Sequence, residues 1–193
     1  MPPRALPLHP VIPGADDSSY HSVRLRPISR AQRFVLGRQL RQQLPRAALG
    51  QWRPDKHRPD PIAQIIRSHE GRLASLIPIR VGRMTASPYG FLRGATVVMT
   101  NDLSRLRTTG ITPVICGDAH LGNFGLYASP ERDLVIDLND FDEAHPGPWE
   151  WDLRRLAVSL WIAGRQNGMS EARCGDAVMA CVGSYRESLR FLS

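Results

Sequence analysis

Hydrophobic side chains recur at three- and four-residue intervals in several segments of the chain, and this spacing predicts amphipathic helices. The segments are residues 31–44, 60–73, 94–106, 153–160 and 170–189. Asp60 can cap the second helix with Pro61 in its first turn, and Ser170 can cap the last one. The buried stripe of the second helix is expected to consist of Ile62, Ile65, Ile66 and Leu73.

Apolar runs with strand character separate these helices. Residues 111–116 and 134–138 are predicted to be apolar, buried strands, and residues 77–84 a short strand or extended segment. The stretch between Asp118 and Asp140 has the length of a β-hairpin joining two loops. With no internal repeat, the pattern predicts an α+β fold in which a small sheet edge leads into a helical subdomain.

Charge divides the chain into two parts. Residues 1–59 hold eleven basic and three acidic side chains, whereas the rest holds fourteen basic and fifteen acidic ones. Residues 1–28 are Pro-rich and aperiodic, and we read them as a flexible tail. The predicted organisation is therefore a basic leader with one helix over residues 1–59 and a second region over residues 60–193.

Composition gives general indications about binding partners and cellular compartment. The leader lacks a packed basic run with interleaved aromatic residues, which argues against nucleic-acid binding and favours a solvated surface. No apolar run reaches the length of a membrane span. Three cysteines in apolar surroundings indicate a reducing, cytoplasmic setting.

The most informative segment, residues 114–156, concentrates acidic and amide side chains around the two predicted strands. Each such residue alone is most simply a turn former or a helix cap. Together, carboxylates at the ends of buried strands are unfavourable unless a cation or another partner compensates them. The segment therefore predicts a divalent-metal site of the kind used in phosphate chemistry. Its chief members are Asp118, His120, Asn123, Asp140 and Asp142.

The spacing of these residues resembles protein kinases. An aspartate followed five positions later by an asparagine, as in Asp118 and Asn123, is the spacing of the kinase catalytic loop, and residues 140–142 stand where kinases have Asp-Phe-Gly. Residues 116–123, Cys-Gly-Asp-Ala-His-Leu-Gly-Asn, are similar to the corresponding motif of aminoglycoside and choline phosphotransferases. Cys116 replaces the usual histidine of that branch, and Asp142 replaces the glycine of kinases.

This resemblance implies a partial protein-kinase-like fold, a hairpin carrying the catalytic loops on a helical subdomain, and Mg²⁺ (or Mn²⁺) with ATP as ligands. It implies Asp118 as the base, Asn123 and Asp140 as metal ligands, and Asp142 as a second-metal or supporting acid. His120 is a further candidate, as a metal ligand or, as hard-cation chemistry favours, a brace of the loop. Arg93 would contact phosphate or pair with one of the acids.

Short motifs spread over residues 83–143 are more specific. They include Arg83-Met84, Phe91-Leu92-Arg93-Gly94 and Asn139-Asp140-Phe141-Asp142-Glu143, and they resemble the bacterial family called domain of unknown function 2252. The similarity runs from about Pro61 onward. It implies a longer chain, whose C-terminal segment would carry a Gly-rich turn and a lysine, so we expect this chain to lack a lobe or to obtain it from a partner chain. Lys56, its only lysine, lies in a Pro-rich loop.

Three functions remain open at this point. The first is phosphoryl transfer from ATP to an acceptor that the sequence does not identify. The second is a two-metal hydrolase in which Asp118, His120, Asp140 and Asp142 hold two cations. The third is a non-catalytic, truncated domain that binds a partner through its arginine-rich leader.

Overall fold

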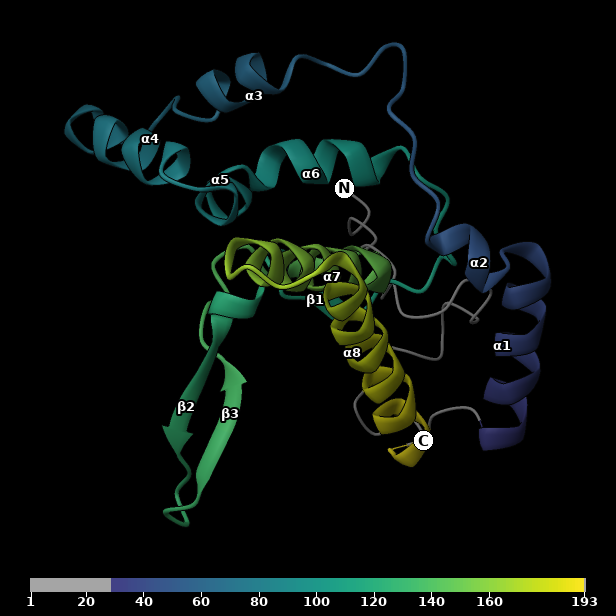
Figure 1. The fold of residues 1–193 in the computed structure, drawn as a ribbon. Helices are drawn as coiled ribbons and strands as arrows, with labels where there is room; N and C mark the ends of the chain where they lie inside the picture. Colours follow the sequence, from purple (N-terminus) through teal and green to yellow (C-terminus); the bar gives the residue numbers. More distant parts are fainter. Residues whose placement is uncertain (1–28, 193) are drawn as a thin grey trace, which may run out of the picture.

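The computed structural model describes residues 29–192, which form a mostly helical α+β structure with two small antiparallel sheets (Figure 1). The predicted α+β class is therefore confirmed. The helices are α1 (Arg30–Gln43), α2 (Arg46–Leu49), α3 (Pro61–Arg67), α4 (Ile77–Thr85), α5 (Pro88–Gly94), α6 (Thr96–Ser104), α7 (Trp149–Gln166) and α8 (Glu171–Phe191). The strands are β1 (Val114–Ile115), β2 (Phe124–Ala128), β3 (Leu134–Leu138) and β4 (His145–Pro146).

Capping residues begin the helices where the sequence predicted them. The Asp60 carboxylate accepts a hydrogen bond from Ala63 N at the start of α3, with Pro61 in the first turn. Ser170 caps α8 by accepting from Arg173 N. Ser29 and Gln32 form a reciprocal capping box at the start of α1.

The prediction of a strand over residues 77–84 was wrong, because this segment is helix α4. Ile77, Ile79 and Val81 alternate as in a strand, but Pro78 lies in the first turn, where a helix needs no N–H donor. Ile79 and Val81 are exposed and only Met84 is buried. The alternation therefore reflects a helix that leaves much of its apolar surface uncovered.

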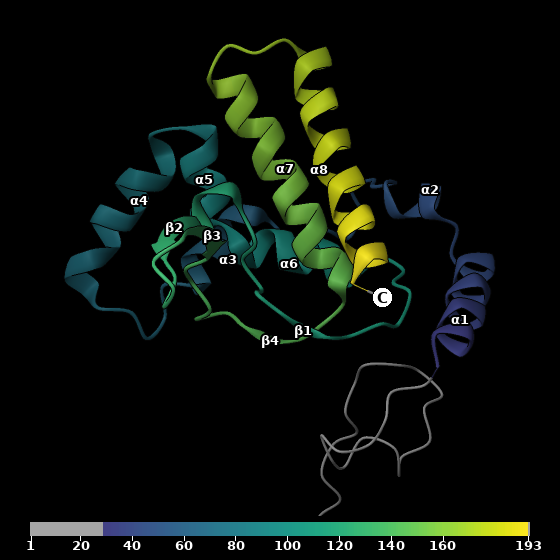
Figure 2. The same cartoon turned by 90° about the horizontal axis from the view of Figure 1, so that it is seen from below.

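Two consecutive helices, α7 and α8, lie side by side (Figure 2). A Cβ on Gly164 would come within 2.7 Å of Cys174 Sγ, so the glycine permits close packing of the two helices. Cys174 is completely buried there. Helix α5 packs against α7 and α4 against α5, which places α4 at the periphery.

A buried cluster of Ile65, Met84, Ala95 and Val98 joins α3 and α4 to the α5–α6 junction. Only one residue of the predicted stripe belongs to this cluster: Ile62, Ile66 and Leu73 are exposed. The reason is that α3 ends at Arg67 and presents a single face to α6.

Strands β2 and β3 form the predicted hairpin, in which Leu126 pairs with Ile136 (Figure 1). This hairpin extends away from the helices, and both of these side chains are more than 60 % exposed. The expectation that residues 134–138 are a buried strand was therefore wrong. Of the other predicted strand, only Val114–Ile115 pairs, with His145–Pro146 of β4.

The predicted tail, residues 1–28, lies outside the described residues. From residue 29 to residue 59, the leader contains α1, α2 and a loop without helix or strand. The Arg58 guanidinium makes two 2.7 Å hydrogen bonds to the Asp102 carboxylate and so attaches this loop to α6. None of the helices between residues 29 and 192 is both long enough and apolar enough to cross a bilayer.

Candidate functional site

The loop of residues 116–123 leaves β1 with a tight turn at Gly117. Gly117 has φ +83°, and a Cβ there would collide with the Glu143 carbonyl oxygen. The Asp152 carboxylate accepts hydrogen bonds from Cys116 N at 2.7 Å and Gly117 N at 3.0 Å. Asp152 is thus an acceptor for backbone N–H groups of this loop. Burial raises the pKa of Asp152, although the two N–H donors act in the opposite direction.

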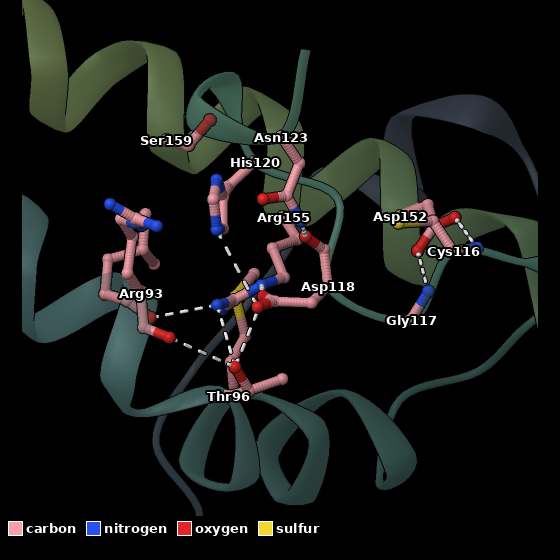
Figure 3. A network of polar contacts seen from close by, with 12 residues as sticks. Arg93, Thr96, Cys116, Gly117, Asp118, His120, Asn123, Asp152, Arg155 and Ser159 are labelled. Atoms are coloured by element: carbon pink, nitrogen blue, oxygen red, sulfur yellow. Dashed lines mark hydrogen bonds and ion pairs between the residues drawn. The ribbon is translucent and has the colours of Figure 1, made fainter. Parts of the chain in front are cut away.

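Two further residues of α7, Arg155 and Ser159, bind the same loop. They lie three and seven positions after Asp152. The Arg155 guanidinium pairs with the Asp118 carboxylate (Figure 3). Ser159 Oγ accepts a hydrogen bond from Leu121 N at 2.9 Å. Arg155 and Ser159 are almost completely buried. One polar stripe of α7 therefore fixes the loop that carries Asp118.

Asp118 uses its two carboxylate oxygens differently. Oδ1 accepts from Arg155 Nε and from the Thr96 hydroxyl at 3.2 Å. Arg155 also donates to the Leu92 carbonyl oxygen at 2.9 Å and to Thr96 Oγ1 at 3.0 Å, so this ion pair joins α5, α6 and α7. Oδ2 has His120 Nε2 as a neighbour at 3.7 Å, beyond hydrogen-bonding distance. Oδ2 is therefore the oxygen available to a ligand.

His120 is buried, with 2 % of its surface exposed, and its Nδ1 has no partner among the described residues. Burial lowers the pKa of His120; the Asp118 charge acts against this effect, and Arg93 and Arg155 add to it. The imidazole is therefore neutral at pH 7. Its ring lies edge-on to that of Tyr89, whose hydroxyl oxygen accepts from Gly122 N at 2.8 Å.

Asn123 lies at the end of the loop and is also buried. Its Nδ2 donates to the Asp118 carbonyl oxygen at 2.9 Å. The backbone carbonyl oxygen of Asn123 accepts a hydrogen bond from Asn139 N at 2.9 Å. This bond links the loop to the residue that follows β3. In this structure Asn123 braces the loop, and it does not line the cavity described below.

Asp140 follows β3, and its backbone carbonyl oxygen accepts from the Cys116 thiol at 3.4 Å. Burial, and then the charges of Asp152, Asp118 and Asp140, raise the pKa of that thiol, which stays protonated and able to donate. Asp142 is exposed; its backbone N donates to Asp140 Oδ1 at 3.2 Å, and it does not line the cavity.

A cavity of about 830 Å³ brings Asp118, His120 and Asp140 together with Arg93. Three further arginines line it, from the loop before α4 and from α4 itself: Arg72, Arg80 and Arg83. Within residues 29–192, none of these four arginines forms an ion pair with a carboxylate. Of the two roles predicted for Arg93, pairing with an acid is thus not observed.

The acids do not gather as densely as the sequence suggested. In the part of the chain that the structure describes, no three His, Cys, Asp or Glu side chains come together as a group that could hold a metal ion. Asp118 and Asp140 alone supply carboxylates to the cavity. Carboxylate oxygens are ligands that suit Mg²⁺, which usually takes one or two of them together with substrate phosphates.

Sequence reasoning missed the residues that position Asp118, namely Thr96, Arg155 and Ser159, and the three additional cavity arginines. The prediction of α7 rested on its apolar residues. The polar residues 152, 155 and 159 have helical spacing as well and therefore share one face of this helix. Arg80 and Arg83 lie three residues apart in α4, but this segment was predicted to be a strand, in which they would lie on opposite faces.

Comparison with known proteins identifies a family. The model of a family described as uncharacterised proteins conserved in bacteria (DUF2252) matches residues 72–193, more than half of the chain. The chain belongs to this family. Neither a curated protein nor a solved structure matches it. The matched residues include every element that lines the cavity, whereas α1 to α3 of this DUF2252 protein lie outside the match.

Proposed function

We propose that this DUF2252 protein is a kinase-like phosphotransferase, in which Asp118 and Asp140 act in metal- and ATP-dependent phosphoryl transfer. One observation carries the proposal: two carboxylates from consecutive loops, on either side of a hairpin, line the same cavity as four arginines without carboxylate partners. Phosphoryl transfer depends mainly on positioning and charge neutralisation, and this arrangement can supply both.

Asp118 is proposed as the residue that orients the acceptor hydroxyl and takes its proton. Arg155 and Thr96 hold Oδ1, so the carboxylate has a fixed direction and Oδ2 remains open to the cavity. His120 stays neutral beside it and does not compete as a cation for Oδ2.

Asp140 would hold Mg²⁺ or Mn²⁺ against the phosphates of ATP. The ion would neutralise phosphate charge, a contribution that Arg93 in the same cavity can complement. Asn123 and Asp142 have no direct role in this proposal, because the first braces the loop and the second lies outside the cavity. A two-metal hydrolase would need more protein ligands in one place than the described residues bring together, and we do not propose it.

The proposal is tested by metal-dependent nucleotide binding. Thermal unfolding and isothermal titration are measured with ATP in the presence and absence of Mg²⁺ or Mn²⁺, for the wild type, Asp140→Asn and Asp176→Asn. Asp176 is an exposed aspartate of α8, so its variant removes the same charge outside the cavity. At a ligand concentration one hundred times Kd, binding should add about 2.7 kcal/mol to the unfolding free energy.

The metal-dependent part of this stabilisation should disappear in Asp140→Asn and persist in Asp176→Asn. Transfer of the γ-phosphate to candidate acceptors is then followed by ³¹P NMR with Asp118→Asn as the catalytic control. Metal-dependent ATP binding that is equal in Asp140→Asn and the wild type would contradict the proposal.

A further inference from the structure

The proposed carboxylate chemistry leaves several residues of the cavity lining unused. They include Arg72 and Arg80, together with the apolar side chains of Leu73, Leu76 and Ile77. Asp118, His120 and Asp140 belong to the same lining, as do Arg83 and Arg93.

Neutral groups, and not acids, hold Arg72 and Arg80. Arg72 Nε donates to the Ser68 carbonyl oxygen at 2.9 Å, and Arg80 Nη1 donates to Ser68 Oγ at 3.4 Å. Arg80 also donates to His69 Nδ1 at 3.1 Å and to the Gly94 carbonyl oxygen at 2.6 Å. Both guanidinium groups are therefore attached to the same turn, at Ser68.

This arrangement keeps two like charges near each other. Burial lowers the pKa of Arg80, and the charge of Arg72 lowers it further. Each guanidinium has five N–H donors, and Arg72 uses only one of them in a described hydrogen bond. Like charges held near each other by neutral partners, with N–H donors unused, favour the binding of an anion.

The charge of the whole cavity supports the same conclusion. Four arginines face two aspartates, and Asp118 is already paired with Arg155, which lies outside the lining. Asp140 is thus the one acid in the lining without a cationic partner, and an anionic ligand would balance the excess positive charge. Phosphate suits the site better than a single carboxylate, because its oxygens can accept from several guanidinium groups at once.

We infer that Arg72 and Arg80, assisted by Arg83, form a phosphate subsite in the cavity that also holds Asp118 and Asp140. The cavity volume of about 830 Å³ exceeds what a phosphate group needs, and the apolar residues of the lining can contact an organic body. The ligand class is therefore a phosphate ester or a polyphosphate, whose phosphate comes from the donor nucleotide or from an acceptor that is already phosphorylated. This inference deepens the proposed function but needs neither the metal ion nor turnover.

Binding of inorganic phosphate and pyrophosphate to the 193-residue protein, measured by isothermal titration without divalent metal at low ionic strength, tests the inference. The main variants are Arg72→Gln and Arg83→Gln, both at exposed positions, so that folding is preserved. Arg67→Gln is the matched control, because Arg67 is exposed on nearby α3 and does not line the cavity.

We expect saturable pyrophosphate binding that Arg72→Gln weakens about tenfold, while Arg67→Gln leaves it within about twofold. Asp140→Asn should bind metal-free pyrophosphate as tightly as the wild type or more tightly, because a negative charge is removed from the cavity. Asp140→Asn is thus expected to weaken metal-dependent ATP binding but not metal-free pyrophosphate binding. The phosphate subsite and the proposed function can therefore fail separately.

The source of the phosphate follows from competition. If ATP displaces pyrophosphate, the subsite binds phosphate of the donor nucleotide. If inorganic phosphate stays bound at a saturating ATP concentration, the subsite binds phosphate of the acceptor. No saturable binding to the wild type, or equal affinities of Arg72→Gln and Arg67→Gln, would overturn the inference.

Discussion

The Arg155 guanidinium, from the middle of α7, forms a buried ion pair with Asp118, the central residue of the candidate site. The side chain of Arg155 is 3 % exposed and that of Asp118 is 18 % exposed. Because Arg155 also donates to the Leu92 carbonyl oxygen and to Thr96, the same pair positions the carboxylate and joins three helices.

Removing either partner of this pair should destabilise the fold strongly. Asp118→Ala would leave the Arg155 charge buried with only neutral partners, and Arg155→Met would do the same to Asp118. We expect each variant to lower the unfolding free energy by about 3–5 kcal/mol, measured by urea denaturation. Arg186→Ala, which removes an exposed pair with Glu187, should change it by about 0–1 kcal/mol.

If Asp118→Ala and Arg155→Met lower the unfolding free energy no more than Arg186→Ala does, the buried pair does not stabilise the fold. The expected cost also affects the choice of catalytic variant. Asp118→Asn retains an oxygen that can accept from Arg155, so it tests chemistry with less loss of stability than Asp118→Ala.

Gly117→Ala should destabilise the protein more than Gly168→Ala, although both glycines have similar positive φ values of 83° and 77°. A Cβ at Gly168 meets open space, so only the backbone conformation is unfavourable, at about 1–2 kcal/mol. A Cβ at Gly117 would also collide with the Glu143 carbonyl oxygen, which should add about 1–3 kcal/mol. Equal unfolding free energies for the two variants would mean that the backbone of residue 143 can move away freely.

Stability should depend on the protonation of His120. Burial lowers its pKa in the folded protein below the ordinary value of 6.5, so the unfolded chain binds a proton at higher pH than the folded one. Between these two pKa values the unfolding free energy rises with pH. The contribution of His120 is therefore complete above about pH 6.5 and is lost as the pH falls toward the folded pKa.

Urea denaturation at pH 7.5 and pH 5.5 measures this effect. The wild type should lose up to about 1.4 kcal/mol per pH unit below 6.5 relative to His120→Gln, which cannot titrate. His57→Gln, at an exposed position, should show the wild-type pH dependence. A wild type and a His120→Gln variant with parallel pH profiles would contradict the proposed neutral, buried state.

The sequence predicted those parts of the fold that local chemistry determines. Caps at Asp60 and Ser170 and the hairpin between the two acidic loops were correct, because turn and cap preferences act over a few residues. The strand predicted over residues 77–84 was wrong, since alternating apolar residues cannot show whether another element covers them. Here nothing in the described chain covers Ile79 or Val81 fully.

For the candidate site, the sequence identified the carboxylates but not their environment. Asp118, His120 and Asp140 share a cavity, as spacing within one segment suggested. The pairing of Asp118 with Arg155, 37 residues later, and the approach of Arg72 and Arg80 depend on tertiary packing, which leaves no local pattern. Whether Asn123 and Asp142 bind metal stays a prediction, although their positions favour other roles.

Asp118 and Asp140 lie in segments of unequal local stability, because Asp140 follows the exposed β2–β3 hairpin. Asp118 is fixed to the buried face of α7, whereas Asp140 follows a two-stranded ribbon that no other described element covers. An isolated ribbon of two strands is marginally stable in water, so it should open transiently while the helices remain intact. Under the proposed function, cation affinity is then governed by the fraction of time in which the ribbon is closed. Substitutions in the turn of residues 129–133 would change that fraction without touching the cavity, and hydrogen exchange of the ribbon amides would report it directly.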